Sequence, residues 1–230
     1  MNTEIRNYII CISVTVILTI LSSVVIRYGS IKSQTELKQR LLALISGSSK
    51  LNICLALMFM VNIAVILSLF FIYKEDVSVL FCLKRALLLT LLWPAAYYDY
   101  KSFRIPNKLI VIGLIYRCVI LIFEFIFEKE NIPGILRSEI VAVTSLFAVS
   151  FLCRVIAKNS LGMGDIKLFI IIGLMLGING SLAAIFCSLI VSFILAVVLL
   201  ITKKKTRKDS IPFAPSLLIG TVISVVLTGV

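Results

Sequence analysis

Long apolar stretches recur along the whole chain, and each is close to the roughly 20 residues needed to cross the hydrocarbon core of a bilayer. The sequence is 60% hydrophobic and 15% charged, with a mean hydropathy of +1.13, outside the range of soluble globular proteins. Only helices and closed barrels satisfy the backbone within lipid. We therefore predict an all-α integral membrane protein, a polytopic bundle of about eight transmembrane helices: Tyr8–Ile26, Leu51–Tyr73, Val79–Tyr98, Leu109–Phe127, Glu139–Ala157, Gly162–Ile178, Ser181–Thr202 and Pro212–Val230.

The distribution of basic residues predicts the orientation of these helices. Most of the 23 lysine and arginine residues fall in connections on one side of the predicted membrane, which identifies that side as cytoplasmic. Residues 27–50 then form a short cytoplasmic loop, and residues 1–230 form a single polytopic membrane domain. The net charge of +12 follows from this bias, and no nucleic-acid-binding module is visible, so we expect no nucleic-acid partner.

The residue composition excludes several kinds of chemistry. The chain has no histidine, which excludes histidine-based catalytic triads and metal sites. Its six cysteines occur singly within apolar segments, without the paired spacing of zinc or redox sites. We therefore expect neither a metal nor a cofactor.

Two carboxylates lie where the predicted topology brings them to the same depth. Asp99 ends the third predicted span and Asp165 begins the sixth, both at the cytoplasmic membrane boundary. Two carboxyl groups at one site can hydrolyse a peptide bond, because one activates water while the other, protonated, polarises the carbonyl. The helix ends suggest the roles: the start of a helix favours the ionised Asp165, so we hypothesise that Asp165 is the base.

Three polar stretches surround these residues: "YYDYKSFRIPNKL" around Asp99, "GMGDIKL" around Asp165, and "KKKTRKDSIPFAPSLLIG" before the last span. In this order they resemble the prepilin peptidases, membrane aspartyl proteases of the GxGD type, over residues 90–220. A GxGD sequence alone is a weak motif. It becomes specific when it opens a membrane span and a second aspartate precedes an R-I-P-N turn.

Residues beside the two aspartates are predicted to support the site. Gly162 and Gly164 lack Cβ atoms, which permits unusual backbone dihedrals and close approach of a helix or substrate. Pro106 ends the helix that carries Asp99, and Asn107 is then expected to cap the next helix. Arg104 and Lys167 form a basic rim, where their alternative role is to anchor the chain at lipid headgroups.

The resemblance implies a membrane endopeptidase in the cytoplasmic membrane of a prokaryote. Its expected substrate is a pilin-like or preflagellin-like precursor with a basic leader and a hydrophobic N-terminal helix, cut on the cytoplasmic side. Many prepilin peptidases also methylate the new amine with a cysteine-rich domain between the first two spans. Residues 27–50 contain no cysteine and are too short for a domain, so we expect no methyltransferase activity.

Two other functions fit some of these features. A presenilin-like or signal-peptide-peptidase-like intramembrane protease also uses a GxGD motif, but its aspartates belong in the middle of the span and no PAL sequence occurs here. A cation-coupled transporter using both aspartates is expected to place them near the membrane midplane. Arg117 and Glu124, charges on one face of the fourth span, are left outside the site, with structural pairing and a functional role both open.

Overall fold

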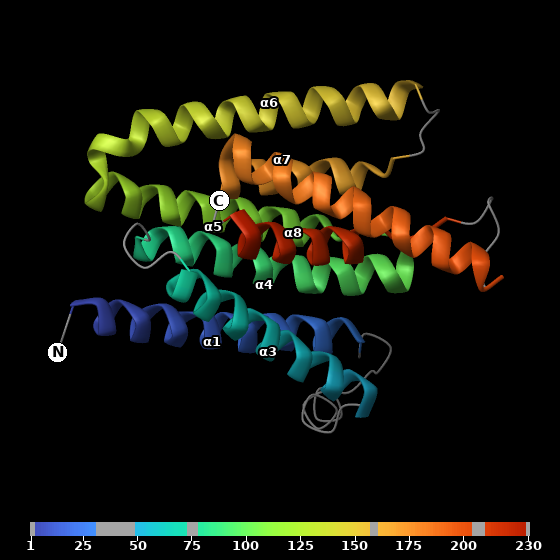
Figure 1. Ribbon diagram of the computed structural model, residues 1–230, viewed down its shortest axis with the longest axis horizontal. Helices are drawn as coiled ribbons and strands as arrows, with labels where there is room; N and C mark the ends of the chain where they lie inside the picture. The colour runs from blue at the N-terminus through green and yellow to red at the C-terminus, as the bar shows by residue number, and fades with distance from the viewer. Residues whose placement is uncertain (1–2, 31–48, 73–77, 157–160, 204–209, 229–230) are drawn as a thin grey trace. The chain divides into compact units, whose positions relative to one another are not determined.

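The computed structural model describes residues 3–30, 49–72, 78–156, 161–203 and 210–228. This part of the chain is entirely helical (Figure 1). Its elements are α1 (Thr3–Ser30), α3 (Ser49–Ile72), α4 (Val79–Ser102), α5 (Asn107–Phe127), the 3-10 helix η1 (Lys129–Asn131), α6 (Ile132–Ile156), α7 (Met163–Ile201) and α8 (Ala214–Thr228). The all-α prediction is confirmed for these residues, whereas residues 31–48 of the predicted cytoplasmic loop lie outside them.

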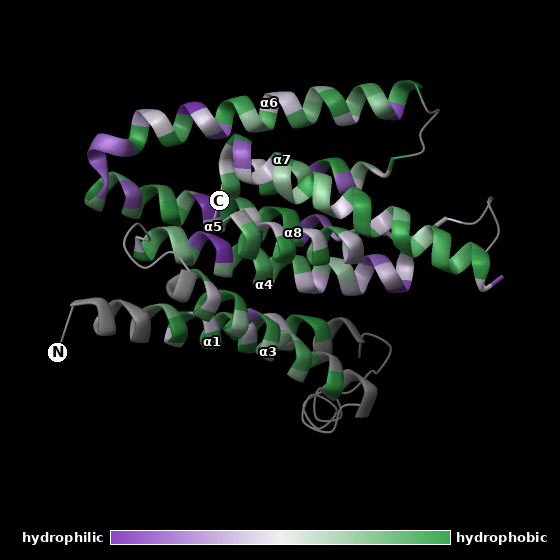
Figure 2. Ribbon diagram, in the orientation of Figure 1, coloured by the Kyte–Doolittle hydropathy of each residue, from purple (hydrophilic) through white to green (hydrophobic). Residues whose placement is uncertain are grey.

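Four helical segments among the described residues have the length and composition to cross a membrane: α4, α5, Lys129–Ile156 and α7. Shorter apolar helical stretches occupy Cys11–Ile26, Leu55–Leu69 and Ala214–Leu227. Figure 2 shows hydrophobic residues along most of the length of the coloured helices. The chain is a membrane protein with multiple candidate transmembrane helices.

The structure divides into two compact units, Met1–Pro94 and Ala95–Val230. In the first unit, α1 packs against α3, and Ser22 donates a hydrogen bond from Oγ to the Sδ of Met58 over 3.5 Å. Trp93 of α4 donates from Nε1 to the Oδ1 of Asn62 of α3 over 3.2 Å. These contacts satisfy the hydroxyl of Ser22 and the indole N–H of Trp93 within the unit.

In the second unit, α7 contacts α5, α6 and α8. Its buried side chains form much of the core, together with Leu217 of α8; those of α7 include Leu168, Ile171, Ile172 and Met175. The packing of α8 against α7 is tightest at Gly220, where an added Cβ would lie 2.3 Å from the backbone nitrogen of Ser188. A glycine at this position lets the two backbones approach closely, as in many membrane helix pairs.

The sequence predicted two spans, Gly162–Ile178 and Ser181–Thr202, where the structure has the single element α7. The element contains a kink at Gly177, whose φ of 67° and ψ of −168° are not helical. Figure 1 shows the chain turning back within α7, so that two helical segments follow one another in a hairpin. The predicted boundary is therefore present as a kink, and Gly177 provides a conformation that residues with a side chain rarely adopt.

Helix α6 begins at Ile132, seven residues before the predicted start at Glu139. Pro133 lies in its first turn, where the missing N–H leaves no helical hydrogen bond unmade. The helix can therefore begin before Pro133 rather than after it.

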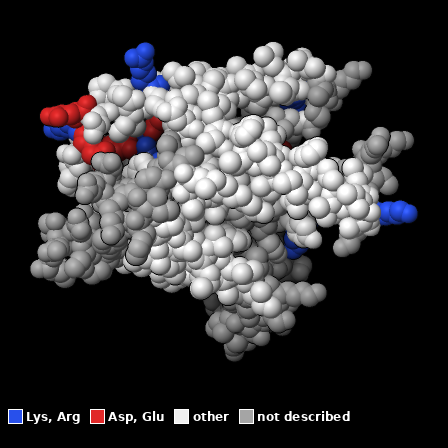
Figure 3. Space-filling view, in the orientation of Figure 1, with Lys and Arg blue, Asp and Glu red and all other residues white. Residues whose placement is uncertain are grey.

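The second unit has two chemically different ends. The last turns of α4 and the first turns of α5, α7 and α8 meet at one end, as the contacts below show. At the other end α5 turns into α6, and Figure 3 shows acidic side chains gathered there beside basic ones, with a largely uncharged surface along the helices. This separation matches helices that place their polar ends on two sides of a membrane.

Candidate active site

Asp99 lies in the last turn of α4 and is only 7% exposed. The backbone N–H of Ala214, the first residue of α8, donates a hydrogen bond to Oδ2 of Asp99 over 2.9 Å. Phe213, which precedes it, packs edge-on against Phe169 of α7 with 5.7 Å between ring centroids. The "IPFAPS" segment therefore brings a backbone donor to Asp99, and Phe213 fastens that segment to α7.

The chain turns sharply after Asp99. The N–H of Phe103 donates to the carbonyl oxygen of Asp99 over 2.8 Å, and Phe103 has a φ of 52°, a left-handed conformation that is uncommon for a residue with a side chain. Residues 104–106 are not helical, as predicted from Pro106. This turn places Ile105 against Gly164 of α7.

The prediction that Asn107 caps α5 is wrong. Pro106 occupies the capping position with φ −62° and ψ 130°, and no side chain makes a capping hydrogen bond there. Proline fixes a φ compatible with this position, so the helix starts without a polar cap. The Oδ1 of Asn107 instead accepts a hydrogen bond from Nζ of Lys167 over 2.7 Å, which joins α5 to α7.

The glycines of the GxGD motif have different roles from those expected. Gly162 caps α7 with an ordinary φ of −67°, and its carbonyl accepts from the N–H of Asp165 over 3.1 Å. A Cβ at Gly164 would lie 3.1 Å from Cβ of Ile105, so this glycine permits close packing of α7 against the turn after α4. Close approach is confirmed, whereas unusual dihedrals at these two glycines are not observed.

Asp165 lies in the first turn of α7, as predicted. Its Oδ1 is buried and has no hydrogen-bond partner among the described residues. A buried carboxyl oxygen without a donor is costly, which makes it a candidate to contact substrate or water. A Cβ at Gly162 would lie 3.0 Å from the other oxygen, Oδ2, so the carboxyl group also depends on this glycine for space.

A cavity of about 320 Å³ brings the two aspartates together. It is lined by Asp99, Phe103, Arg104, Ile105, Asn107, Gly162, Met163, Gly164, Asp165 and Lys167. All the predicted site residues except Pro106 belong to this lining, and Pro106 lies in the turn between Ile105 and Asn107. Both aspartates therefore line the same cavity.

Sequence patterns did not identify every contributor to this site. Phe103, Ile105 and Met163 line the cavity but have no polar group that signals chemistry. The N–H of Ala214 is a backbone donor, so its residue type carries no information about it. The only available signal was the position of the "IPFAPS" segment before the last span.

The type IV leader peptidase family matches residues 86–201 of the chain, just over half its length, and this range contains both aspartates and the turn between α4 and α5. The chain belongs to the type IV leader peptidase family. The family consists of aspartic peptidases, so its chemistry agrees with a carboxyl pair in one cavity. The "IPFAPS" segment lies beyond the matched range.

A curated relative agrees with this family. The chain is 32% identical over 69 residues to the prepilin leader peptidase/N-methyltransferase of Bacillus subtilis (strain 168). The aligned stretch covers 30% of this chain and 28% of the relative. The match therefore spans less than a third of the length of that protein. No solved structure matches the chain.

Proposed function

We propose that this leader peptidase family member is a membrane aspartic endopeptidase that removes the leader of type IV prepilin-like or preflagellin-like precursors. The observation that carries the proposal is the cavity shared by Asp99 and Asp165, within the range that matches the family. The family supports cleavage of a leader peptide over the presenilin-like and transporter alternatives. Methyltransferase activity is not part of the proposal, because the short segment 27–50 contains no cysteine.

In the proposed reaction the two carboxyl groups act as a unit with one shared proton. The ionised group takes a proton from water, whose oxygen attacks the carbonyl carbon, while the protonated group donates to the carbonyl oxygen. The proton taken from water then passes to the leaving amine as the peptide bond breaks, and the other carboxylate takes back a proton from a hydroxyl group of the tetrahedral intermediate. Like charges in one small cavity cannot both ionise cheaply, which supports a shared proton.

The hydrogen bonds bear on which aspartate is ionised. The N–H of Ala214 stabilises a negative charge on Asp99, whereas Oδ1 of Asp165 has no donor among the described residues. This opposes the hypothesis that Asp165 is the base, which relied on the helix end alone. We therefore assign the role of general base to the pair of carboxyl groups rather than to one of the two residues.

We further propose that the site faces the cytoplasm in a prokaryotic cell membrane. Lys101, Arg104 and Lys167 lie at the cavity end of the helices, and Glu128 and Glu130 lie at the opposite end. Basic residues favour the cytoplasmic side. Four helical segments among the described residues are long and apolar enough to cross the membrane, and α8 is shorter, with 15 residues.

The membrane itself is proposed to position the substrate. A precursor helix held in the bilayer places the peptide bond at its cytoplasmic boundary at the depth of Asp99 and Asp165. The basic leader then lies in the cytoplasm, and the apolar helix stays in lipid. This confines the search for the site to a plane and supplies part of the orientation that catalysis requires.

The experiment that tests the proposal measures cleavage of a purified pilin-like precursor by the purified protein in lipid vesicles. Asp99→Asn and Asp165→Asn preserve shape but remove the acid and base, so each is expected to lower the rate by about 10²- to 10⁴-fold. Glu130→Gln is the matched control, because it makes the same kind of change to an exposed carboxylate outside the cavity. Wild-type cleavage by both aspartate variants would rule out the proposed mechanism.

A further inference from the structure

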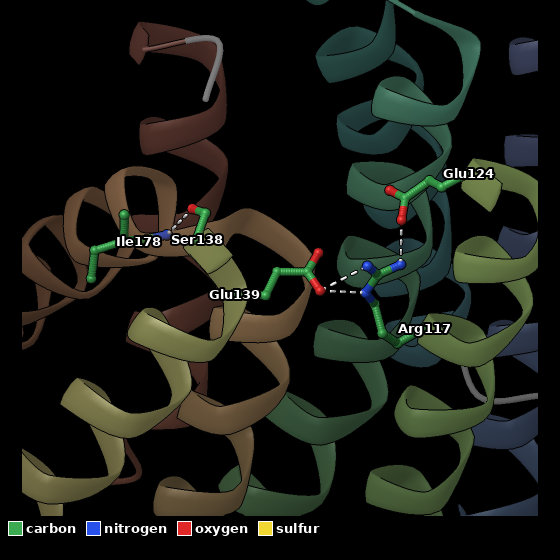
Figure 4. A network of polar contacts seen from close by, with 5 residues as sticks. All are labelled: Arg117, Glu124, Ser138, Glu139 and Ile178. Atoms are coloured by element: carbon green, nitrogen blue, oxygen red, sulfur yellow. Dashed lines mark hydrogen bonds and ion pairs between the residues drawn. The ribbon is translucent and has the colours of Figure 1, made fainter. Parts of the chain in front are cut away.

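Among the described residues of the second unit, three charged side chains are buried outside the cavity (Figure 4). Arg117 of α5 lies between Glu124 of the same helix and Glu139 of α6, with exposed fractions of 4%, 3% and 3%. Nη1 of Arg117 donates to Glu124 over 2.8 Å, and Nε donates to Glu139 over 2.9 Å. Nη2 of Arg117 lies 2.7 Å from the same oxygen of Glu139. Ionisable groups within membrane helices are costly, so their retention requires a reason.

The charge balance separates the roles of the two glutamates. Arg117 and Glu124 are both on α5 and already form a neutral pair. Arg117 thus has one carboxylate partner on its own helix and a second one, Glu139, on α6. The contact of Glu139 with Arg117 connects α6 to α5, whereas the contact of Glu124 with Arg117 lies within α5.

Ser138, the residue before Glu139, makes a second connection from the same turn of α6. The N–H of Ile178 donates to Oγ of Ser138 over 3.0 Å, directly after the kink at Gly177 (Figure 4). A Cβ at Gly177 would lie 2.6 Å from that Oγ, so the kink and the serine fit closely. Two neighbouring residues of α6 thus hold α5 on one side and the kink of α7 on the other.

The same helices are connected again at the cavity end. Lys167 of α7 donates to Asn107 of α5, and Nη1 of Arg154, near the end of α6, donates to the carbonyl oxygen of Leu161. The segment of α7 that carries Asp165 is therefore held by α6 at both ends. Along α5, ten residues separate Asn107 from Arg117, about 15 Å at the helical rise per residue.

We propose that Ser138 and Glu139 form a brace that positions the active site from a distance. By fixing α5 and the kinked α7 on α6, the brace sets how Asp165 and Lys167 face Asn107 across the cavity. Ser138 and Glu139 are positioning residues in this proposal, which rests on the proposed peptidase function. Glu124 pairs with Arg117 within α5 and is not part of the brace.

Two matched variants test the brace. Glu139→Leu leaves the neutral pair Arg117–Glu124 on α5 but removes the connection to α6, whereas Glu124→Leu leaves Arg117–Glu139 and keeps it. Each removes one carboxylate and leaves one ion pair. We expect Glu139→Leu to lower kcat for precursor cleavage roughly tenfold with KM unchanged, since small misplacements of reacting groups are costly. Glu124→Leu is expected to stay within about twofold of wild type on the same principle.

A conservative variant separates positioning from general stability. Glu139→Gln keeps an oxygen that accepts from Arg117, so it is expected to restore most of the lost kcat. An unfolding transition in detergent monitors stability for each variant. The brace would be overturned if kcat fell equally in Glu139→Leu and Glu124→Leu, or if Glu139→Gln did not restore kcat.

A measurement independent of activity distinguishes failure of the brace from failure of the proposed function. Asn107→Cys and Lys167→Cys are introduced together in a chain without its native cysteines. A short bifunctional thiol reagent then links the two cysteines, and the rate of linkage measures how the two positions face each other across the cavity. Glu139→Leu is expected to change this rate, and Glu124→Leu is not. Linkage unaffected by Glu139→Leu contradicts the brace even if the wild-type protein cleaves no precursor.

Ser138→Ala provides the test if Glu139→Leu does not fold. It removes a single hydroxyl group and with it the contact to Ile178. The expected result is a lower kcat and an altered linkage rate with KM unchanged. Wild-type values for both in a folded Ser138→Ala protein would overturn the proposal.

Discussion

At the scale of single residues, the candidate site combines side chains from motifs with a backbone donor from a distant segment. Asp99 is buried at a helix end, where the helix dipole disfavours its charge. The N–H of Ala214 opposes this by donating a hydrogen bond to Oδ2. The distance of 115 residues between the two explains why no local pattern around Asp99 signals this contact.

Replacing Ala214 tests the importance of that donor. Ala214→Pro removes the N–H but is compatible with the first position of a helix. A hydrogen bond to a charged group contributes about 1.5–3 kcal/mol, so we expect kcat/KM for precursor cleavage to fall roughly 10- to 100-fold. Ala214→Gly keeps the N–H and serves as the control, with activity near wild type. Equal activities of the two variants would show that the donor is not used.

Gly162 gives a second prediction at this scale. A Cβ there would lie 3.0 Å from Oδ2 of Asp165, so Gly162→Ala should push the carboxyl group aside and lower kcat about three- to tenfold. Gly134→Ala is the matched control, because nothing lies within 4 Å of its added Cβ. Kinetics of precursor cleavage measure both, and unchanged kcat in Gly162→Ala contradicts the described position of Asp165.

The sequence predicted the residue types of the site better than their contacts. Asp99, Asp165 and the basic rim follow from motifs, because charged residues in an apolar chain are conspicuous. Asn107 was misassigned as a cap, since a preference for capping is local and the competing contact with Lys167 comes from a residue 60 positions away. Pro106 takes the capping position in its place.

At the scale of helices, the placement of the site depends on how α8 packs against α7. Ala214 begins α8, and Gly220 in the same helix lies against the backbone of Ser188. Anything that separates α8 from α7 is therefore expected to move the donor away from Asp99. The hydropathy pattern predicted α8 as a span but contained no information about this contact, because close packing depends on the partner helix.

Gly220→Ala tests this packing. The added Cβ would lie 2.3 Å from the backbone nitrogen of Ser188, which cannot turn away as a side chain can. Overpacking of this kind costs about 1–3 kcal/mol, so the unfolding midpoint in detergent should fall and cleavage should weaken. Gly134→Ala again supplies the control, with an unchanged midpoint. A wild-type midpoint in Gly220→Ala would contradict the described approach of the two helices.

At the scale of the whole chain, hydropathy and charge predicted the class of protein and most helix positions. They succeeded because crossing a bilayer imposes a length and an apolar composition on each span. They also placed the boundary between the predicted spans Gly162–Ile178 and Ser181–Thr202 next to Gly177, where the backbone of α7 leaves the helical range. They also gave no basis for the two compact units, which depend on contacts between helices.

The proposed orientation gives a prediction for the chain in its membrane. Lys101, at the cavity end of α4, and Glu130, at the turn between α5 and α6, are both exposed and are expected on opposite sides. Introduced cysteines, Lys101→Cys and Glu130→Cys, can be labelled with a membrane-impermeant maleimide in a chain without its native cysteines. We expect labelling of the Glu130→Cys protein in intact cells and of the Lys101→Cys protein only after permeabilisation, since basic residues are retained on the cytoplasmic side. Labelling in the reverse pattern would place the carboxyl pair outside the cell, where a cytoplasmic leader cannot reach it.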